Sequence, residues 1–341
     1  MTDTWLTGTT PAPHPSGITV HGGSFYAVTN DLYSEAFLWK SDNGVSWTTT
    51  PLHPEGETSG LQWGGIISNG NILCAYTDYL STALTAVSMD GIAWTYTDTT
   101  ITLNYSGAIA SKGSQICIIG LDNSYVSTNG TSWTEGTGSP FTIFNIVNKN
   151  SFVSSPTNYS ALFWYYNAGE GIMNVKAAVS TNGLTWTVGN FVTNDLEWGA
   201  MAYGSSTFVA IALDTIYSPS GAPTQMAASS TDGLSWTLRD LPPIATDGSD
   251  KWGTVTFCNG RFVLISANKA KIRVSTDGHT WTEAADFSYA GSYGYWSLAA
   301  SSATTAVFVT VIYNSLSAAV GPASLPIAFW TRLHGTTQTF S

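Results

Sequence analysis

The eight-residue stretch STDGLSWT, from Ser230 to Thr237, decides the fold because the chain repeats it. It returns as STDGHTWT from Ser275, and the pattern Ser-x-(Asp/Asn)-Gly-x-x-Trp-Thr occurs six times in 341 residues. The acidic or amide residues of the six copies are Asn43, Asp90, Asn129, Asn182, Asp232 and Asp277, and the tryptophans are Trp47, Trp94, Trp133, Trp186, Trp236 and Trp281. A phrase that recurs this often indicates a repeat architecture.

Each copy predicts a tight turn between two strands. The Asp or Asn side chain can bond to its own backbone two residues on, and the Gly can take the positive φ that closes a short loop. The flanking residues alternate as strands do, for example KIRVS before the last turn and TWTEA after it. The tryptophan is large enough to pack across to a neighbouring element. Every part of the phrase therefore has a structural role.

The spacing of the turns predicts the architecture. Successive tryptophans are 47, 39, 53, 50 and 45 residues apart, and each unit divides into four short strands, such as KWGTVTF, GRFVLIS, KIRVS and HTWTEA. A period of about 40–50 residues with four strands is typical of a propeller blade. A divergent seventh unit begins at GYWSLAA. We therefore expect an all-β, seven-bladed β-propeller of four-stranded antiparallel blades, with six blades plus an accessory hairpin as the alternative.

The two ends of the chain are expected to meet. In the seventh unit, LHGTTQT stands where the turn should be, without its Asp and Trp, whereas Trp5 in DTWLTGT resembles the missing tryptophan. Either Thr4–Thr9 or the C-terminal TTQTF should complete this blade. Residues 1–16 are thus predicted to be an N-terminal arm and residues 17–341 a single propeller domain.

Composition limits the possible partners and cofactors. The formal net charge of −11 disfavours binding to nucleic acid, which needs a basic surface. Cys74, Cys117 and Cys258 lie inside apolar runs without metal-ligand spacing, so they predict buried side chains rather than a disulfide framework or a zinc site. No metal or cofactor is expected. The sequence also has no signal peptide and no run long enough to span a membrane, which predicts synthesis in a cytoplasm without membrane insertion.

The repeated phrase resembles the Asp-box (BNR) repeat of sialidase-like propellers, in the compact SxDGxxWT form found in bacterial and bacteriophage proteins. The resemblance implies that the repeated turn joins the third and fourth strands of each blade, on the face opposite the binding site. The family includes sialidases, other glycosidases, photosystem assembly factors, sorting receptors and phage virion proteins. The resemblance therefore implies a fold without implying one function.

A catalytic site is not predicted. Sialidases of this family hold the substrate carboxylate with three arginines, but Arg239, Arg261, Arg273 and Arg332 do not include three at equivalent blade positions. A glycosidase needs two carboxylates. Loops between the fourth strand of one blade and the first of the next contain candidates: Glu55, Glu57, Asp195, Glu197, Asp247 and Asp250. Because acidic residues are common in solvated loops, we expect no enzyme and, in particular, no sialidase.

Aromatic residues are expected to mark the opposite face. Tryptophans recur near the start of the first strand of several blades, at Trp63, Trp198, Trp252 and Trp296. A ring of indoles could stack on sugars, or it could fill the wedge between blades. Tyr33, Tyr79 and Tyr217 fall between second and third strands, and one insertion there, 156–171, contains Tyr159, Phe163, Trp164, Tyr165 and Tyr166. This insertion is either a partner-binding loop or a long ribbon with half its aromatics buried.

These features lead to one functional expectation. We expect a non-enzymatic bacteriophage virion protein, a tail, fibre or capsid-decorating propeller made in the bacterial host cytoplasm. It would bind host-surface glycan or another virion protein through the face opposite the repeated turns, as a monomer or homo-oligomer. A polysaccharide-cleaving glycosidase and a bacterial assembly factor are the alternatives.

Overall fold

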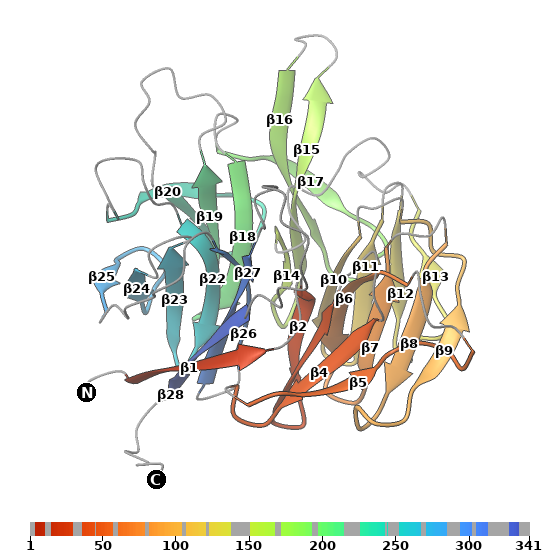
Figure 1. Ribbon diagram of the computed structural model, residues 1–341. Helices are drawn as coiled ribbons and strands as arrows, with labels where there is room; N and C mark the ends of the chain where they lie inside the picture. The colour runs from red at the N-terminus through yellow and green to blue at the C-terminus, as the bar shows by residue number, and fades with distance from the viewer. Residues whose placement is uncertain are drawn as a thin grey trace, which may run out of the picture.

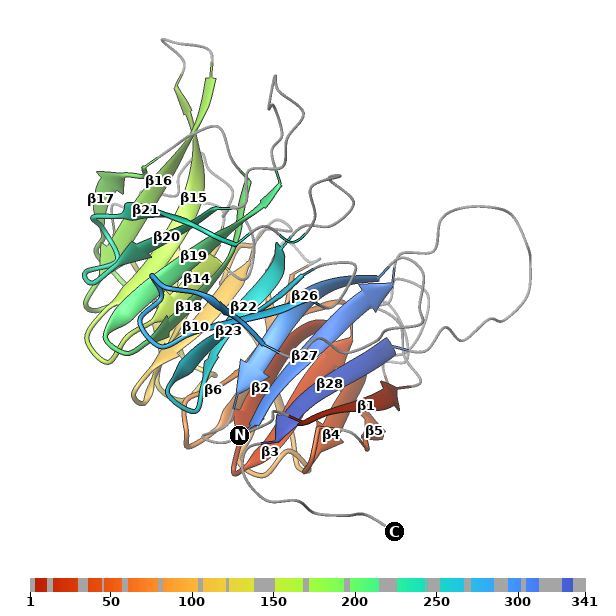
Figure 2. The ribbon, with the colours of Figure 1, turned by 90° about the vertical axis from the view of Figure 1, so that its left-hand side faces the viewer.

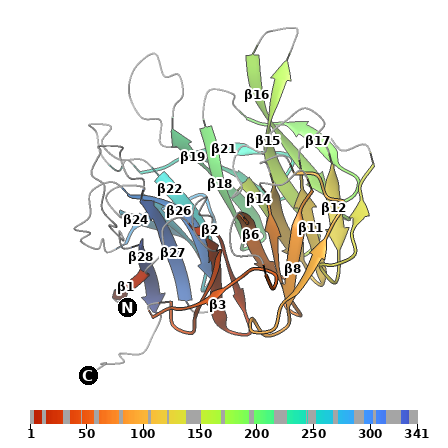
Figure 3. The same cartoon turned by 45° about the vertical axis from the view of Figure 1, so that its right-hand side comes forward.

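The computed structural model describes residues 4–10, 15–29, 36–44, 46–56, 61–78, 82–103, 107–120, 123–137, 151–167, 172–192, 197–214, 226–242, 244, 252–266, 271–284, 294–301, 305–312 and 327–333. The regular elements in these ranges are β-strands arranged in four-stranded antiparallel sheets. The sheets stand around a common centre, with the first strand of each sheet innermost (Figures 1, 2 and 3). The chain is a β-propeller.

Within these ranges, six blades each consist of four strands that follow one another in the chain and pair in that order. Blade 1 contains β2 (Pro15–His21), β3 (Ser24–Thr29), β4 (Phe37–Ser41) and β5 (Thr48–Pro51). Blade 2 contains β6 (Trp63–Ser68), β7 (Leu73–Thr77), β8 (Leu84–Ser88) and β9 (Thr95–Asp98). Blade 3 contains β10 (Ala108–Lys112), β11 (Gln115–Ile119), β12 (Ser124–Ser127) and β13 (Thr134–Glu135).

The other three of these blades follow the same plan. Blade 4 contains β14 (Phe152–Ser154), β15 (Tyr159–Asn167), β16 (Ile172–Ser180) and β17 (Thr187–Asn190). Blade 5 contains β18 (Glu197–Gly204), β19 (Thr207–Asp214), β20 (Met226–Ser230) and β21 (Thr237–Asp240). Blade 6 contains β22 (Trp252–Cys258), β23 (Arg261–Ser266), β24 (Ile272–Ser275) and β25 (Thr282–Glu283).

The two ends of the chain form one further sheet, the closing sheet. Its strands are β26 (Gly294–Ser301), β27 (Thr305–Ile312), β28 (Ile327–Leu333) and β1 (Thr4–Thr10), paired in that order. The antiparallel register of β1 on β28 runs from Thr4 opposite Leu333 to Thr10 opposite Ile327. Strand β26 contacts β22 on one side and β2 on the other, so this sheet joins blade 6 to blade 1.

This arrangement corrects the expectation of seven blades. Six blades, in the described part of the chain, are each built from one sequence repeat, which is the number in the alternative prediction. The remaining strands do not form a seventh blade of the same kind, nor the accessory hairpin of that alternative, but a composite sheet from both chain ends. The sequence explains this difference, because LHGTTQT lacks the Asp and Trp of a repeated turn. The segment Thr4–Thr10 takes the outermost position, and TTQTF lies outside the described residues.

In all six copies of the repeated turn, the Ser hydroxyl donates to the Asp or Asn side chain and accepts the Gly N–H. In blade 5, the Ser230 hydroxyl donates to Asp232 Oδ1 at 2.9 Å and accepts the Gly233 N–H at 2.8 Å. Asp232 Oδ1 also accepts the N–H groups of Leu234 and Ser235 at 2.8 and 2.7 Å. The six glycines of these turns have φ between 72° and 76°, a region that side chains other than hydrogen disfavour. The turn therefore needs Ser, Asp or Asn, and Gly at these places.

The same turn fixes each blade to the preceding one. A Cβ on Gly130 would lie 2.6 Å from Val87 of blade 2, and a Cβ on Gly183 would lie 2.7 Å from Val126 of blade 3. The Thr85 hydroxyl of blade 2 donates to the Gly130 carbonyl at 2.9 Å. The turn tryptophans pack in the same spaces between blades, as Trp94, Trp133, Trp186, Trp236 and Trp281 do. Glycine is thus required by close packing as well as by φ.

We predict that the closing sheet depends on β1. Deleting residues 1–10 leaves the outer edge of β28 without its partner strand, and several backbone hydrogen bonds are lost. At about 0.5–1.5 kcal/mol net for each hydrogen bond, the free energy of unfolding should fall by several kcal/mol. Urea denaturation measures this loss. An unchanged midpoint would contradict the pairing of β1 with β28.

We predict that the turn of blade 6 stabilises the fold less as the pH falls through a defined range. Hydrogen bonds from the Thr280 and His279 N–H groups, together with the Ser275 hydroxyl, hold the pKa of Asp277 at about 2. An unfolded Asp titrates near pH 4, so the carboxylate stabilises the fold above about pH 4. This contribution is lost as the pH falls from about 4 to about 2. Thermal unfolding across this range should show it.

The matched variants for this prediction come from the chain itself. Asp277→Asn should fold at pH 7 and lose part of the acid sensitivity, because three native turns use Asn43, Asn129 and Asn182. Asp277→Ala removes the acceptor for two backbone N–H groups and should cost about 1–2 kcal/mol at pH 7. An Ala variant as stable as the wild type would show that this acceptor is dispensable.

Candidate functional site

The two faces of the propeller are made of different connections. The repeated turns join the third strand to the fourth and lie on one face, which we call the turn face. On the other face, the open face, the chain passes from second to third strands and from one blade to the next. The β15–β16 pair rises from the open face beyond the other blades (Figure 1). The connections on the open face therefore differ more from blade to blade than the repeated turns of the turn face do.

The β15–β16 pair extends beyond the strands that flank it. Its register runs from Tyr159 opposite Ser180 to Asn167 opposite Ile172. Strand β14 pairs only with residues 159–161, and β17 pairs only with residues 176–179. Val175 is buried in the core between blades 4 and 5. Residues 164–167 and 172–174 therefore form a two-stranded extension, which we call the free ribbon. In the register, Tyr165, Tyr166 and Asn167 lie opposite Asn174, Met173 and Ile172.

The insertion 156–171 is thus mostly strand rather than loop, as its alternative interpretation proposed. Tyr159 and Phe163 are buried, with 0% and 1% exposure, in the core between blades 3 and 4. The Tyr159 hydroxyl donates to the Gln115 carbonyl at 3.2 Å, and the Lys112 ammonium lies 5.2 Å from its ring centre. This burial contradicts the prediction that Tyr159 binds a ligand or partner.

The other aromatics of the insertion lie in the free ribbon. Trp164, Tyr165 and Tyr166 are opposite Val175, Asn174 and Met173 in the register. Their side chains fall outside the described part of the structure. The backbone nevertheless places three consecutive aromatic residues of the sequence on the projecting part of the molecule.

The first-strand tryptophans are packing residues. Trp63, Trp198 and Trp252 have exposures of 0%, 0% and 1% and lie in the cores between blades. The Trp63 indole donates to the Leu52 carbonyl at 2.9 Å, and Trp198 meets Phe191 edge to face at 4.8 Å between ring centres. An indole without exposed surface offers no face to a sugar. This finding contradicts the predicted stacking role and supports the alternative, a wedge between blades.

Other predicted positions are outside the described side chains. Tyr33, Tyr79 and Tyr217, and the carboxylates Glu57, Asp195, Asp247 and Asp250, lie outside the described residues. Trp296 lies in β26 and Glu197 begins β18, but their side chains are not described. Glu55 is exposed. These positions stay predictions.

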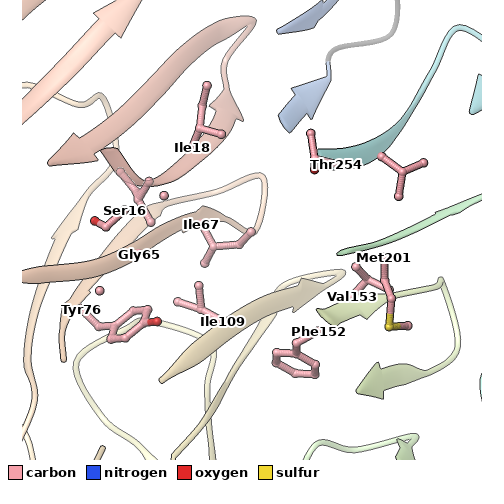
Figure 4. Close-up of a pocket in the computed structure, with 14 residues that line it drawn as sticks. Ser16, Ile18, Gly65, Ile67, Tyr76, Ile109, Phe152, Val153, Met201 and Thr254 are labelled. Atoms are coloured by element: carbon pink, nitrogen blue, oxygen red, sulfur yellow. The ribbon is translucent and has the colours of Figure 1, made fainter. Parts of the chain in front are cut away.

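A cavity of about 160 Å³ lies in the channel between the innermost strands (Figure 4). Its described lining comes from β2, β6, β7, β10, β14, β18 and β22, namely Ser16, Gly17, Ile18, Gly64, Gly65, Ile66, Ile67, Tyr76, Ile109, Phe152, Val153, Met201, Thr254 and Val255. Charged side chains are absent from this described lining. No sequence motif predicted this cavity, because residues from blades far apart in the chain form it.

Two hydroxyl groups of the cavity lining form hydrogen bonds within the fold. The Ser16 hydroxyl donates to the Trp63 carbonyl, and the Tyr76 hydroxyl donates to the Gly107 carbonyl at 2.7 Å. Burial, with a smaller effect of the Asp78 carboxylate, raises the pKa of Tyr76 well above its usual value. The phenol therefore stays protonated at neutral pH and cannot serve as a general base.

The described residues contain neither a metal-binding cluster nor a membrane-spanning helix. Among them, no group of three or more His, Cys, Asp or Glu side chains is arranged to hold a metal ion. None of the described segments is a helix with the length and apolar character needed to cross a membrane. Cys74, Cys117 and Cys258 are buried as predicted, and burial raises the pKa of Cys74 to about 12.

Comparison with known proteins supports the fold. No family model and no curated protein sequence matches the chain. A structure of YCF48 bound to D1 peptide is similar, with a TM-score of 0.66 and 13% identity over 98% of this chain and 97% of the other. Virginiamycin B lyase from Staphylococcus aureus gives a TM-score of 0.64 and 10% identity, over 96% and 99% of the two chains. The Pan2 WD40 domain of Neurospora crassa gives 0.59 and 10%, over 98% and 97%. At these identities the similarity shows a β-propeller and no particular activity.

We predict that Trp198 stabilises the fold. Trp198→Ala removes a fully buried indole between blades 4 and 5 and should cost about 3–5 kcal/mol in the free energy of unfolding. Val188→Ala, at a half-exposed position of β17, should change it by less than about 0.5 kcal/mol. Urea denaturation compares the two variants. A Trp198→Ala protein with wild-type stability would contradict the packing role.

Proposed function

We propose that this protein is a non-enzymatic binding propeller of the Asp-box type that serves in a bacteriophage virion as a tail, fibre or capsid-decorating subunit. The observation that carries the proposal is the free ribbon, which extends beyond its neighbouring strands on the open face. A structural ring needs no such extension. A projecting strand pair is suited to contact a second molecule.

The sequence of the free ribbon supports a binding role. It reads WYYN in 164–167 and IMN in 172–174, without a charged residue. Aromatic residues and Met are enriched at protein interfaces, whereas charged residues are depleted from interface cores. Strand edges that face solvent are ordinarily protected by Lys, Pro or bulges. The free ribbon contains no Lys or Pro, and its register has no bulge. A protein surface is therefore the favoured partner, and host-surface glycan is the second possibility.

The described lining of the channel supports a function without catalysis. Its side chains are aliphatic, aromatic or hydroxyl-bearing, and the Tyr76 phenol is held protonated. General acid–base chemistry needs a group that can gain or lose a proton near neutral pH. A polysaccharide-cleaving glycosidase would have to use carboxylates outside this lining, such as Glu197 and Asp250.

A bacterial assembly factor is a second candidate function. One observation favours it: the fold is similar to YCF48, whose structure contains a bound D1 peptide. A protein segment as ligand would suit both candidates. They differ in the origin of the partner, which would be a phage particle in the first case and a bacterial protein in the second.

The test has two parts. The wild-type protein is first sought in purified phage particles, and a variant without the free ribbon is then compared with it. We expect mass spectrometry to detect the wild-type protein in purified virions. Replacing residues 164–174 with a short Gly-Ser turn keeps the buried Val175 and the pairs from Tyr159–Ser180 to Phe163–Lys176. This variant should unfold within a few degrees of the wild type, and its incorporation should fall at least about tenfold, equivalent to 1.4 kcal/mol.

The matched control changes apolar side chains of the turn face. Met89→Ser and Ile92→Ser alter residues with 77% and 78% exposure on the turn of blade 2, and they should leave incorporation unchanged. A truncated protein incorporated as well as the wild type would remove the free ribbon from the proposal. Absence of the wild type from particles, together with no signal on a glycan array, would overturn the virion role. Capture of one bacterial protein would then favour the assembly factor.

A further inference from the structure

The outermost strand of blade 4 ends before the free ribbon begins. Strand β17 ends at Asn190, which is opposite Lys176 of β16. The next residue, Phe191, turns into the core between blades 4 and 5, where its ring lies 4.8 Å from that of Trp198 between ring centres. The edge of β16 that faces away from β15 is called the outer edge here. Among the described strands, none pairs with this outer edge at residues 172–174.

The outer edge presents backbone groups in strand geometry. In an antiparallel pair, the N–H and C=O groups of alternate residues point to the neighbouring strand, and those of the intervening residues point away from it. Met173 is opposite Tyr166 of β15. Either Met173, or both Ile172 and Asn174, therefore direct an N–H and a C=O outward. These groups need a hydrogen-bond partner, and the edge of another strand has the matching donors and acceptors.

An added strand would also stabilise the free ribbon itself. Two strands alone are marginally stable in water, whereas three or more strands with an apolar face can be stable. The free ribbon has two strands, 164–167 and 172–174, and projects from the blade (Figures 1 and 3). A helix uses its backbone groups internally, and a sugar does not repeat its hydroxyls at the spacing of a strand. This chemistry selects an extended protein segment.

The charge of the free ribbon selects the composition of that segment. The free ribbon has no charged residue, and at its base the Lys176 ammonium donates to the Asn190 side chain. A charged side chain placed beside the free ribbon would lose part of its hydration without gaining an ionic partner from these residues. An uncharged segment avoids this cost.

We propose that an extended, uncharged segment of the protein partner adds to the outer edge of β16 as a further strand, in line with β17. This inference rests on the proposed binding function and adds to it the mode of binding and the chemistry of the partner segment. In this mode, main-chain hydrogen bonds supply affinity and the side chains of alternate residues supply specificity.

The first experiment uses a library of short random peptides as the probe. We expect the wild-type protein to enrich peptides whose affinity falls at least about tenfold, equivalent to 1.4 kcal/mol, when residues 164–174 are replaced with the Gly-Ser turn. The matched control, Met89→Ser with Ile92→Ser on the turn face, should bind these peptides as the wild type does. Failure to enrich any peptide that depends on the free ribbon would overturn the inference, whereas the protein could still be incorporated into particles.

The second experiment blocks the backbone donors of one enriched peptide, one position at a time. Strand addition predicts a period of two: N-methylation should weaken binding at least about tenfold at alternate positions and little at the intervening ones. Nuclear Overhauser contacts should join backbone protons of the peptide to those of Ile172–Asn174. An aperiodic N-methylation profile, or contacts with Trp164–Asn167 instead, would contradict strand addition at this edge, and loss of incorporation without the free ribbon would still support the binding function.

Sedimentation of the protein alone tests whether the added strand comes from a second copy of the chain. We expect the wild type and the variant without the free ribbon to sediment alike as monomers. A wild-type dimer that is lost in this variant would overturn the assignment of the outer edge to a segment of another protein.

Discussion

The backbone N–H of one glycine in each blade, donated to a serine hydroxyl three residues earlier, is the interaction on which the rest of the structure depends. Its length is 2.7–2.8 Å in all six repeated turns. The bond holds the third and fourth strands together, and it places the glycine against the preceding blade, where Val87 or Val126 leaves no room for a Cβ. One short turn thus sets both the hairpin and the contact between blades.

This constraint also separates structure from function. The turns occupy the turn face. Blades 2 to 6 each place their turn tryptophan in the core shared with the preceding blade, and blades 2, 5 and 6 place a first-strand tryptophan there as well. Residues that repeat from blade to blade are therefore the residues that build the ring. The free ribbon is a feature that does not repeat, and it belongs to the open face.

Local features were predictable from the sequence, and features that depend on the whole ring were not. The turns of Asp232 and Asp277 could be placed because their chemistry lies within eight residues. Trp198 was ambiguous, because a recurring indole suits a wedge between blades as well as a sugar site, and only its burial distinguishes them. The number of repeat-built blades was wrong because the last unit lacks the Asp and Trp of the repeated turn. Its completion by Thr4–Thr9, one of two predicted alternatives, is confirmed by the pairing of β1 with β28. The cavity needs residues from Ser16 to Val255, which no local pattern connects.

Amide hydrogen exchange at the six turn glycines tests the central claim most directly. Gly44, Gly91, Gly130, Gly183, Gly233 and Gly278 donate buried N–H groups, whereas Gly22 and Gly23 lie in an exposed turn with similarly positive φ. We predict that all six exchange at least about a hundredfold more slowly than Gly22 and Gly23, since each 1.4 kcal/mol of opening free energy slows exchange tenfold. Exchange of the six at the rate of the exposed glycines would contradict the account.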